Sequence, residues 1–342
     1  MQNITTVGLD LAKNVFQVHG VNAEGTAVLR RQLRRAQVLE FFKKLPACLV
    51  GMEACGGAHY WAREIAALGH DVRLIPPAYI KPYIKRGKTD AADAEGICEA
   101  VTRKTMRFVP VKTADQQGVT MMMKARELLV RQQTQTVNAI RSHMHELGII
   151  TGKGVGKISE LIAIISDKED RRVPDVARPA LMALADQLRS LSGEIEKLTD
   201  VIADMVKQDA DMRRLATIPG VGVITAASIK ALVPDISGFK SARHFSAWLG
   251  LTPRPHSSGG KERLGRISKM GNTTLRKLLV MGAMSILRRA KNAETAPQWI
   301  KGLLARRPSK VVAIAMANKA ARIAFALLTK GDVYRRSPVS AG

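Results

Sequence analysis

The sequence predicts an α/β domain at the N-terminal end, followed by a mostly helical region. Over roughly the first 90 residues, short apolar runs rich in Val and Thr alternate with amphipathic helical patterns, as in a sheet covered by helices. From Asp90 onward the apolar positions recur with helical spacing. A chain of 342 residues is long enough for two domains with cores of their own.

The expected elements of the α/β domain follow one another in a simple order. Strands are expected at residues 4–12, at 15–21, in AVLRRQL, in ACLVGMEA and in DVRLIPP. Helices are expected in VLEFFKKL and HYWAREIAALGH, and the later helices begin with KTDAADAEGICEAVTRK and a long one over 115–147. Residues 148–180 are less regular.

A heptad pattern follows these elements. Apolar residues recur at steps of three and four at Leu181, Leu184, Leu188, Leu191, Ile195, Leu198, Ile202 and Met205. Because an unshared seam would expose an apolar stripe, the pattern predicts a coiled coil, either in an antiparallel hairpin with 115–147 or between subunits. One amphipathic helix packed on its own domain is the alternative. The expected domains are 1–112, a helical region 113–212 and a basic domain 213–330, with a disordered tail over 331–342.

The charge of the chain points to a polyanionic partner. It carries 54 Lys and Arg against 29 Asp and Glu, a formal charge of +25. From Arg213 to the end there are 24 basic and 4 acidic residues, whereas residues 1–212 hold 30 and 25. A merely solubilising surface would not be so uneven, so we expect the C-terminal part to bind nucleic acid.

The sequence indicates no membrane partner. No export signal opens the chain, and the apolar run VVAIAMANKAARIAFALL is interrupted by Asn318, Lys319 and Arg322. The three cysteines have no zinc-site spacing and are expected to be reduced thiols of a cytoplasmic protein.

Four carboxylates of the first domain are candidate metal ligands. Asp10 and Glu53 lie at the ends of two expected strands, and Asp90 and Asp93 lie on one face of a helix start. Carboxylates that converge repel one another unless cations lie between them, and hard oxygen ligands suit one or two Mg²⁺ ions. Each acid alone has a structural alternative, a helix cap for Asp90 or Asp93 and a turn for Asp10. Together, their order fits an RNase H-like (RuvC-like) nuclease core.

The basic domain contains two candidate phosphate-binding segments. IPGVG, with Gly220 and Gly222, predicts a turn between helices in a helix-hairpin-helix-like unit, with a plain tight turn as the alternative. The second segment is a loop, TPRPHSSGGKERLGRISKMGN. Its candidate residues are Ser257, Ser258, Gly259, Lys261, Arg263, Arg266 and Lys269. From the residues alone, a phosphate clamp is favoured over a serine nucleophile or a solvated loop.

Six motifs of the chain belong together: they are GLDLAK, MEACGG, KTDAADAE, IPGVG, FSAWLGLTPRPHSSGG and ISKMGNTTLRKLL. They resemble the motifs of DEDD-type insertion-sequence transposases, the bridge-RNA-guided recombinases. The resemblance extends from about Thr5 to about Lys330. It implies that Asp10, Glu53, Asp90 and Asp93 bind metal. It also implies that Ser258, directly before Gly259, is the catalytic serine, although the neighbouring Ser257 makes the sequence ambiguous here.

The resemblance further implies a function. Ser258 would attack a DNA phosphodiester, form a transient phosphoserine link and pass the strand to a new partner with Mg²⁺ at the carboxylates. A structured guide RNA would choose donor and target DNA by base pairing. The protein would be a bacterial, nucleoid-associated homo-oligomer, a dimer or a dimer of dimers. Two alternatives are a RuvC-like structure-selective nuclease that hydrolyses with water, and a non-enzymatic nucleic-acid-binding scaffold.

Overall fold

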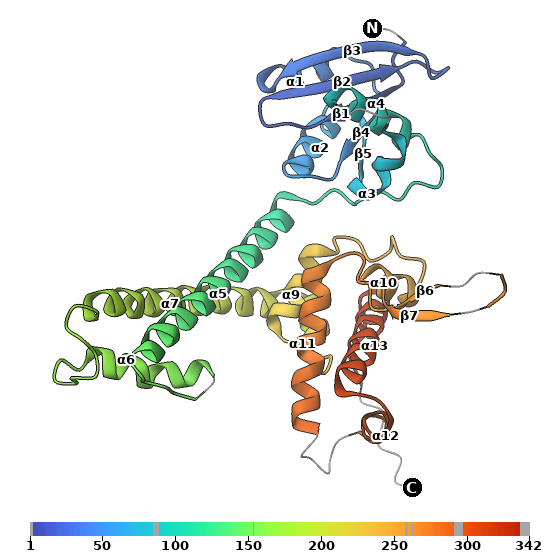
Figure 1. Ribbon diagram of the computed structural model, residues 1–342. Coiled ribbons are helices and arrows are strands. Elements are labelled where there is room, and N and C mark those ends of the chain that lie inside the picture. The colour runs from blue at the N-terminus through green and yellow to red at the C-terminus, as the bar shows by residue number, and fades with distance from the viewer. Residues whose placement is uncertain are drawn as a thin grey trace. The chain divides into compact units, whose positions relative to one another are not determined.

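The computed structural model describes residues 3–84, 89–152, 154–256, 259–261, 263–290 and 297–335. The chain divides into two compact units, Met1–Gln117 and Gly118–Gly342, and each is described by itself. Figure 1 labels their elements.

The first unit is built on a mixed five-stranded sheet with the strand order β3-β2-β1-β4-β5. The strands are β1 (Thr6–Asp10), β2 (Val15–Val21), β3 (Ala27–Arg34), β4 (Leu49–Glu53) and β5 (Asp71–Ile75). The pairs β1–β2 and β2–β3 are antiparallel, whereas β1–β4 and β4–β5 are parallel. As a result, β1 and β4 end at the same edge of the sheet, and β2 begins there.

Helices cover both faces of this sheet. On one face, α1 (Val38–Lys43) and α2 (Ala58–Ala66) bury Phe42, Trp61 and Ile65 in a core with alternate residues of β1, such as Val7 and Leu9. On the other face, α4 (Asp90–Val101) packs on β1, β2 and β4. The short helices α3 (Pro77–Ile80) and η2 (Lys81–Tyr83) follow β5, and η1 (Arg35–Gln37) follows β3.

The second unit is mostly helical. A long helix, α5 (Ala114–Glu146), begins in the first unit and continues into the second. It is followed by η3 (Val155–Lys157), α6 (Ile158–Ser166), α7 (Arg178–Gln208), α8 (Ala210–Ala216), α9 (Val223–Leu232), α10 (Ala242–Trp248), α11 (Thr273–Ala290), α12 (Gln298–Arg306) and α13 (Ser309–Lys330). A small antiparallel hairpin, β6 (Pro253–Pro255) and β7 (Leu264–Ile267), interrupts the helices.

Within the second unit, α5 and α7 contact each other in opposite chain directions. Gln133 Nε2 donates to Ser192 Oγ at 2.9 Å, and Arg126 Nε donates to Thr199 Oγ1 at 2.9 Å. Half of the expected heptad seam, Leu181, Leu188, Leu191 and Ile202, is buried, and the other half, Leu184, Ile195, Leu198 and Met205, is only half-buried. The seam is therefore not fully covered within one chain, and the coiled coil stays a prediction.

The core of the second unit lies around α13. Its residues Val312, Met316, Ala317, Ala321 and Ala324 are buried with those of α8 to α11. By length and composition alone, α13 could cross a membrane, but this buried face makes it a central packing helix of the unit. Its conspicuous apolar content is what the core requires.

The expected α/β domain followed by a mostly helical region is confirmed. Two local expectations were incomplete. The irregular stretch 148–180 contains α6, and the expected serine loop is in part a hairpin, whose strands Pro253–Pro255 and Leu264–Ile267 pair with each other. Pattern alone could not find such short strands, because the residues of β6 and most of β7 are exposed and show no alternation.

Candidate active site

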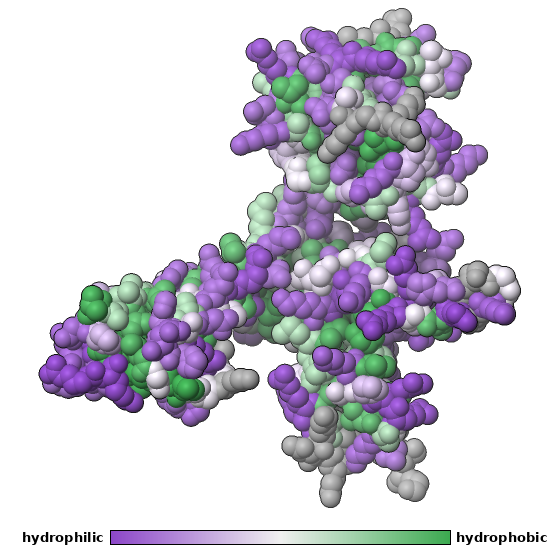
Figure 2. Space-filling view, in the orientation of Figure 1, coloured by the Kyte–Doolittle hydropathy of each residue, from purple (hydrophilic) through white to green (hydrophobic). Residues whose placement is uncertain are grey.

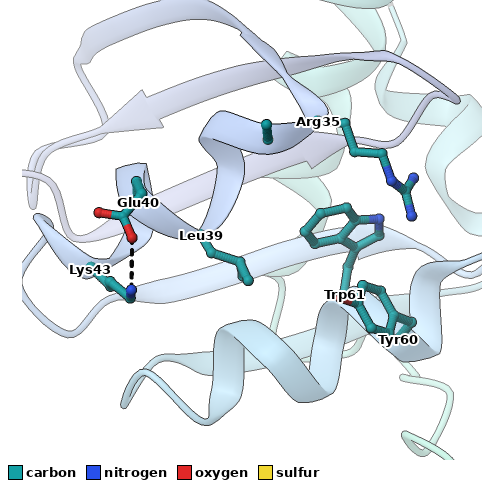
Figure 3. A pocket seen from close by; sticks show the side chains of 7 residues that line it. Arg35, Leu39, Glu40, Lys43, Tyr60 and Trp61 are labelled. Carbon is teal, nitrogen blue, oxygen red and sulfur yellow. Dashed lines mark hydrogen bonds and ion pairs between the residues drawn. The ribbon is translucent and has the colours of Figure 1, made fainter.

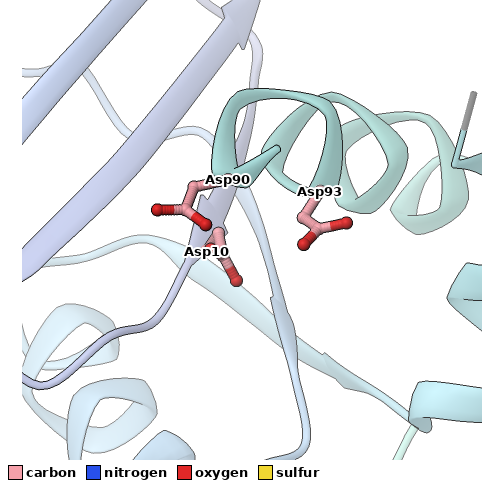
Figure 4. Close-up of side chains that lie close together, drawn as sticks. All are labelled: Asp10, Asp90 and Asp93. Carbon is pink, nitrogen blue, oxygen red and sulfur yellow. The ribbon is translucent and has the colours of Figure 1, made fainter. Parts of the chain in front are cut away.

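Three carboxylates meet at the edge of the sheet in the first unit. Asp10 is the last residue of β1, and Asp90 and Asp93 lie in the first turn of α4. One oxygen from each lies within 4.8 Å of the others. Figure 4 shows the three side chains close together, from the end of β1 and the first turn of α4. The first helical turn places both α4 residues above the end of β1, so the sequence spacing of three brings two acids to one point.

The two acids of α4 do not cap the helix. The N-cap is Thr89, whose Oγ1 accepts a hydrogen bond from the Ala92 N–H at 3.2 Å. The structural alternative expected for Asp90 and Asp93, a helix cap, is therefore not found, because Thr89 caps the helix. Both carboxylates remain available for another ligand.

Burial and neighbouring negative charge both disfavour the ionised form of Asp10. Partial burial of Asp10 raises its pKa to about 6, with Asp93, Asp90 and then Glu53 adding to the increase. No lysine or arginine is among the groups that shift this pKa within the described part of the chain. Excess negative charge on oxygen ligands fits a divalent cation, which Asp10, Asp90 and Asp93 would hold.

The fourth expected acid is close but separate. Glu53 ends β4, the strand paired in parallel with β1, and its charge contributes to the raised pKa of Asp10. Its carboxylate is not one of the three that meet within 4.8 Å. Glu53 thus lies on the same sheet edge, beside the cluster.

The IPGVG turn joins α8 to α9 in the second unit. Gly220 has a φ of +83°, and a Cβ there would lie 3.0 Å from the Gly282 backbone of α11. Gly220 is therefore required by the turn and by close packing. Gly222, by contrast, is the exposed N-cap of α9 and has open space around its Cα.

The β6–β7 hairpin is part of the expected serine loop. Ser257 and Ser258 are outside the described residues. On either side of them, the His256 N–H donates to the Arg263 carbonyl at 2.8 Å, and Gly259 and Gly260 have φ values of +56° and +76°. The expected basic residues of the hairpin, Lys261, Arg263, Arg266 and Lys269, are all exposed.

The base of this hairpin is fixed by a residue that sequence reasoning missed. Arg276 of α11 donates to the Leu249 carbonyl at 3.0 Å and to the Met270 carbonyl at 2.8 Å, which lie just before β6 and just after β7. A Cβ at Gly250 would lie 2.6 Å from the Met270 nitrogen, so the two ends of the segment touch. One arginine among many carries no sequence signal for this role.

Sequence comparisons with known proteins give matches over nearly the whole chain. Residues 212–298 match the model of the transposase IS116/IS110/IS902 family, and residues 7–149 match a DEDD transposase model of the IS110 type. A probable family 20 transposase of Pseudomonas aeruginosa is 49% identical over 97% of this chain and 99% of its own length. The transposase for insertion sequence element IS1328 of Yersinia enterocolitica is 38% identical over 98% of this chain and all of its own length. A pilin gene-inverting protein of Moraxella lacunata is 25% identical over 82% of this chain and 83% of its own length.

Proposed function

Because the chain belongs to the IS116/IS110/IS902 family of transposases, enzymes that cut DNA and transfer its strands, we propose that it is an RNA-guided recombinase with a serine nucleophile. The observation that carries the proposal is the meeting of Asp10, Asp90 and Asp93 within 4.8 Å at the end of β1. The strand order and the mixed pairing of the sheet support an RNase H-like core for this unit.

The carboxylates are proposed to hold Mg²⁺ with Glu53 beside them. When bound, the ion would offset the charge of a phosphodiester and of the oxygen that leaves it. Asp10 would share the ion with Asp90 and Asp93, because one carboxylate oxygen of each lies within 4.8 Å of the others. The raised pKa of Asp10 makes metal binding at this residue compete with protons.

Ser258 is proposed as the nucleophile. Its Oγ would form a bond to the phosphorus of a DNA strand while the bond from phosphorus to the deoxyribose oxygen breaks. The serine proton would pass to a base, for which His256 is the nearest candidate in sequence, and the leaving oxygen would take up a proton. Attack by a second deoxyribose hydroxyl would reverse these steps, so phosphodiester bonds are exchanged without net hydrolysis.

Basic groups around the serine would hold the strand. Lys261, Arg266 and Lys269 are exposed along the hairpin and suit phosphate oxygens in charge-assisted hydrogen bonds. Gly259 would permit close approach of the backbone because it has no side chain, and its positive φ is one that glycine adopts readily. The exposed Gly222 at the start of α9 is a second proposed phosphate contact, in a helix-hairpin-helix-like unit.

The name of one relative favours an exchange of DNA strands without net hydrolysis over hydrolysis by water. A pilin gene-inverting protein is 25% identical to this chain over 82% of this chain's length. Inversion of a DNA segment requires every cut strand to be rejoined, which a covalent intermediate allows. A water-dependent RuvC-like nuclease, the alternative function, would leave free ends.

A guide RNA and a homo-oligomer complete the proposal. The chain has 4% aromatic residues and a charge of +25, which suits binding to backbone and duplex shape while base pairing reads the sequence. The half-buried seam residues Leu184, Ile195 and Leu198 would be covered by a second subunit in a dimer or a dimer of dimers. Several cuts in one exchange require more than one copy.

The decisive comparison uses labelled donor DNA, Mg²⁺ and the RNA that co-purifies with the protein. Ser258→Ala is expected to abolish strand cleavage but retain binding, whereas Ser257→Ala, the matched control, keeps cleavage. Asp10→Asn and Glu53→Gln are also expected to abolish cleavage. Cleavage by Ser258→Ala at the wild-type rate would favour the nuclease, and unchanged products from the acid variants would favour a scaffold.

A further inference from the structure

A groove of about 550 Å³ on the first unit is separate from the carboxylate cluster. It lies between η1, α1 and α2, and its lining includes Arg35, Leu39, Glu40, Lys43, Tyr60 and Trp61 (Figure 3). Its volume is in the range of sites for single small ligands. The groove combines aromatic rings, one aliphatic wall and charged groups, which is the mixture that a nucleotide requires.

The aromatic side of the groove is supported by the core between the sheet and the helices. Trp61 is 5% exposed and packs edge-on against Phe16 of β2, with ring centroids 5.0 Å apart. Tyr60 makes an edge contact with Trp61 at 5.2 Å and is itself 40% exposed. A rigid buried ring therefore supports an exposed one, and an exposed ring on a rigid support is a stacking platform for a base.

Arg35 forms the cationic side. Its guanidinium carbon lies 5.0 Å from the centre of the Trp61 ring, so the arginine is oriented by a cation–π contact. Among the described residues, this cation–π contact is the only interaction recorded for the guanidinium, which has neither a hydrogen-bond nor an ion-pair partner. Its N–H donors are therefore available to a phosphate.

The charge around the groove favours a polyanion. Arg31 of β3 and Arg35 of η1 are exposed, and Arg31 lies on the same face of the strand as the buried Leu33, towards α1 and α2. Arg30 points to the other face, where it pairs with Glu95 of α4 at 3.9 Å. Much of the surface over β3 is hydrophilic in Figure 2. The acid of the groove, Glu40, is paired with Lys43 at 2.7 Å, so it does not reverse this charge. Its remaining acceptor capacity suits an N–H group of a base.

The groove lies at the same end of the sheet as the carboxylates. The Arg35 N–H donates at 2.9 Å to the carbonyl of Asn14, in the turn that follows Asp10. Arg34 pairs with Val15, next to the residue that supports Trp61, and β3 is two strands away from β1. Two strand spacings are about 10 Å. The groove lies on the face covered by α1 and α2, whereas the carboxylates lie on the face covered by α4, so a strand that reaches both would pass around this end of the sheet.

We propose that this groove holds an unpaired nucleotide of the nucleic acid on which the carboxylates act, with its base stacked on Tyr60 and its phosphate at Arg35. The inference rests on the proposed function, because it assumes that a strand reaches Asp10. An unpaired nucleotide fits better than a duplex, because a paired base within a helix has no free face to offer Tyr60. Such a contact would hold the strand unpaired where it passes around the end of the sheet towards the carboxylates.

Binding of 5-iodouracil oligonucleotides of one length to the full-length protein tests the proposal. The probes are single-stranded DNA, single-stranded RNA and the corresponding DNA duplex, all in EDTA so that no chemistry occurs. Tyr60→Ala and Arg35→Gln are each expected to weaken binding of a single-stranded probe about tenfold. Tyr60→Phe keeps the ring and is expected to bind like the wild type.

Lys104→Gln is the matched control for Arg35→Gln. It removes one positive charge from an exposed position beyond the C-terminal end of α4, whose N-terminal end carries the carboxylates. Its affinity is expected to change less than twofold. Photo-crosslinking is expected at Tyr60, and the probe that crosslinks, DNA or RNA, identifies which strand occupies the groove.

Two results would overturn the proposal. One is equal affinity of Tyr60→Ala, Arg35→Gln and Lys104→Gln, with thermal melts showing that all three are folded. The other is an equal loss by Tyr60→Ala for the duplex and the single strand. Neither concerns the chemistry, because the proposed function fails by a different result, the absence of Mg²⁺-dependent cleavage by the wild-type protein.

Discussion

Gly8 of β1 lies directly against Cys98 of α4. A Cβ added to Gly8 would lie 2.6 Å from the Cys98 nitrogen and 2.7 Å from the Cys98 Cβ, and it would also meet the Ala94 carbonyl. The helix can therefore rest on the strand only where the strand has no side chain. Because Gly8 and Asp10 point to the same face of β1, this contact brings Asp90 and Asp93 to Asp10.

Gly8→Ala is expected to push α4 away from the sheet. Overpacking of a dense core costs about 1–3 kcal/mol of the free energy of unfolding, and the carboxylates would separate as the helix moves. We therefore expect loss of cleavage together with weaker Mg²⁺ binding, measured by calorimetry on the folded variant. Gly193→Ala, in open space on α7, is the control and is expected to stabilise the protein by about 1 kcal/mol. Full activity of Gly8→Ala would disprove the role of this contact.

The pH dependence of stability should reveal the charge on Asp10. Its pKa is raised from 3.8 to about 6, so the folded state binds this proton more tightly than the unfolded chain does. The free energy of unfolding of the metal-free protein is therefore expected to fall as pH rises through this interval. With allowance for solvent screening of a half-buried group, the fall is about 1 kcal/mol.

Urea unfolding in EDTA at several pH values measures this effect. Asp10→Asn is expected to lack the fall and to be the more stable protein at pH 7, although it is inactive. Mg²⁺ should restore the stability of the wild type and have little effect on the variant. An identical pH profile for both proteins would show that Asp10 is not the strained group.

Arg276 is expected to act as a positioning residue for the serine segment. Arg276→Met removes the bonds to the Leu249 and Met270 carbonyls, which fix the two ends of the hairpin. We expect cleavage to fall at least tenfold, with DNA affinity changed less than threefold, because the charge at the hairpin itself is retained. The control is Lys277→Met, whose exposed ion pair with Glu127 at 3.7 Å contributes little. Equal cleavage by both variants would contradict the positioning role.

The exposed lysine of the hairpin should contribute a phosphate contact. Lys261→Gln is expected to weaken binding of DNA regardless of its sequence and to reduce the slope of log affinity against log salt by about one. Titrations at several salt concentrations measure the slope. A loss confined to particular DNA sequences would assign Lys261 to base recognition instead.

Much of the first unit could be predicted from the sequence. The strand Val15–Val21 has the predicted bounds, and the order of strands and helices followed from their alternation. The meeting of Asp10 with Asp90 and Asp93 was also predictable, since strand ends and a helix start converge at one sheet edge. The exact position of Glu53, beside the three rather than among them, depends on side-chain packing that has no sequence pattern.

The second unit was harder to predict, because its local signals have more than one physical cause. From the sequence, Gly220 is a candidate phosphate-binding residue, and in the structure its close approach to Gly282 also requires a glycine at this position. In the first unit, the groove at Tyr60 and Trp61 was not predicted at all, since HYWAREIAALGH indicates only an amphipathic helix. Its cationic side comes from Arg35, a residue of another element that is brought there by the fold.

The central claim is that a serine of the basic hairpin becomes covalently bound to DNA in a reaction that needs the carboxylate cluster. The most direct measurement is mass spectrometry of the peptide containing Ser258, after incubation with donor DNA, guide RNA and Mg²⁺ and digestion of the DNA. We predict a phosphate-linked nucleotide on Ser258 in the wild type and none in Asp10→Asn. Cleaved DNA with an unmodified Ser258 peptide at every time point would contradict the account.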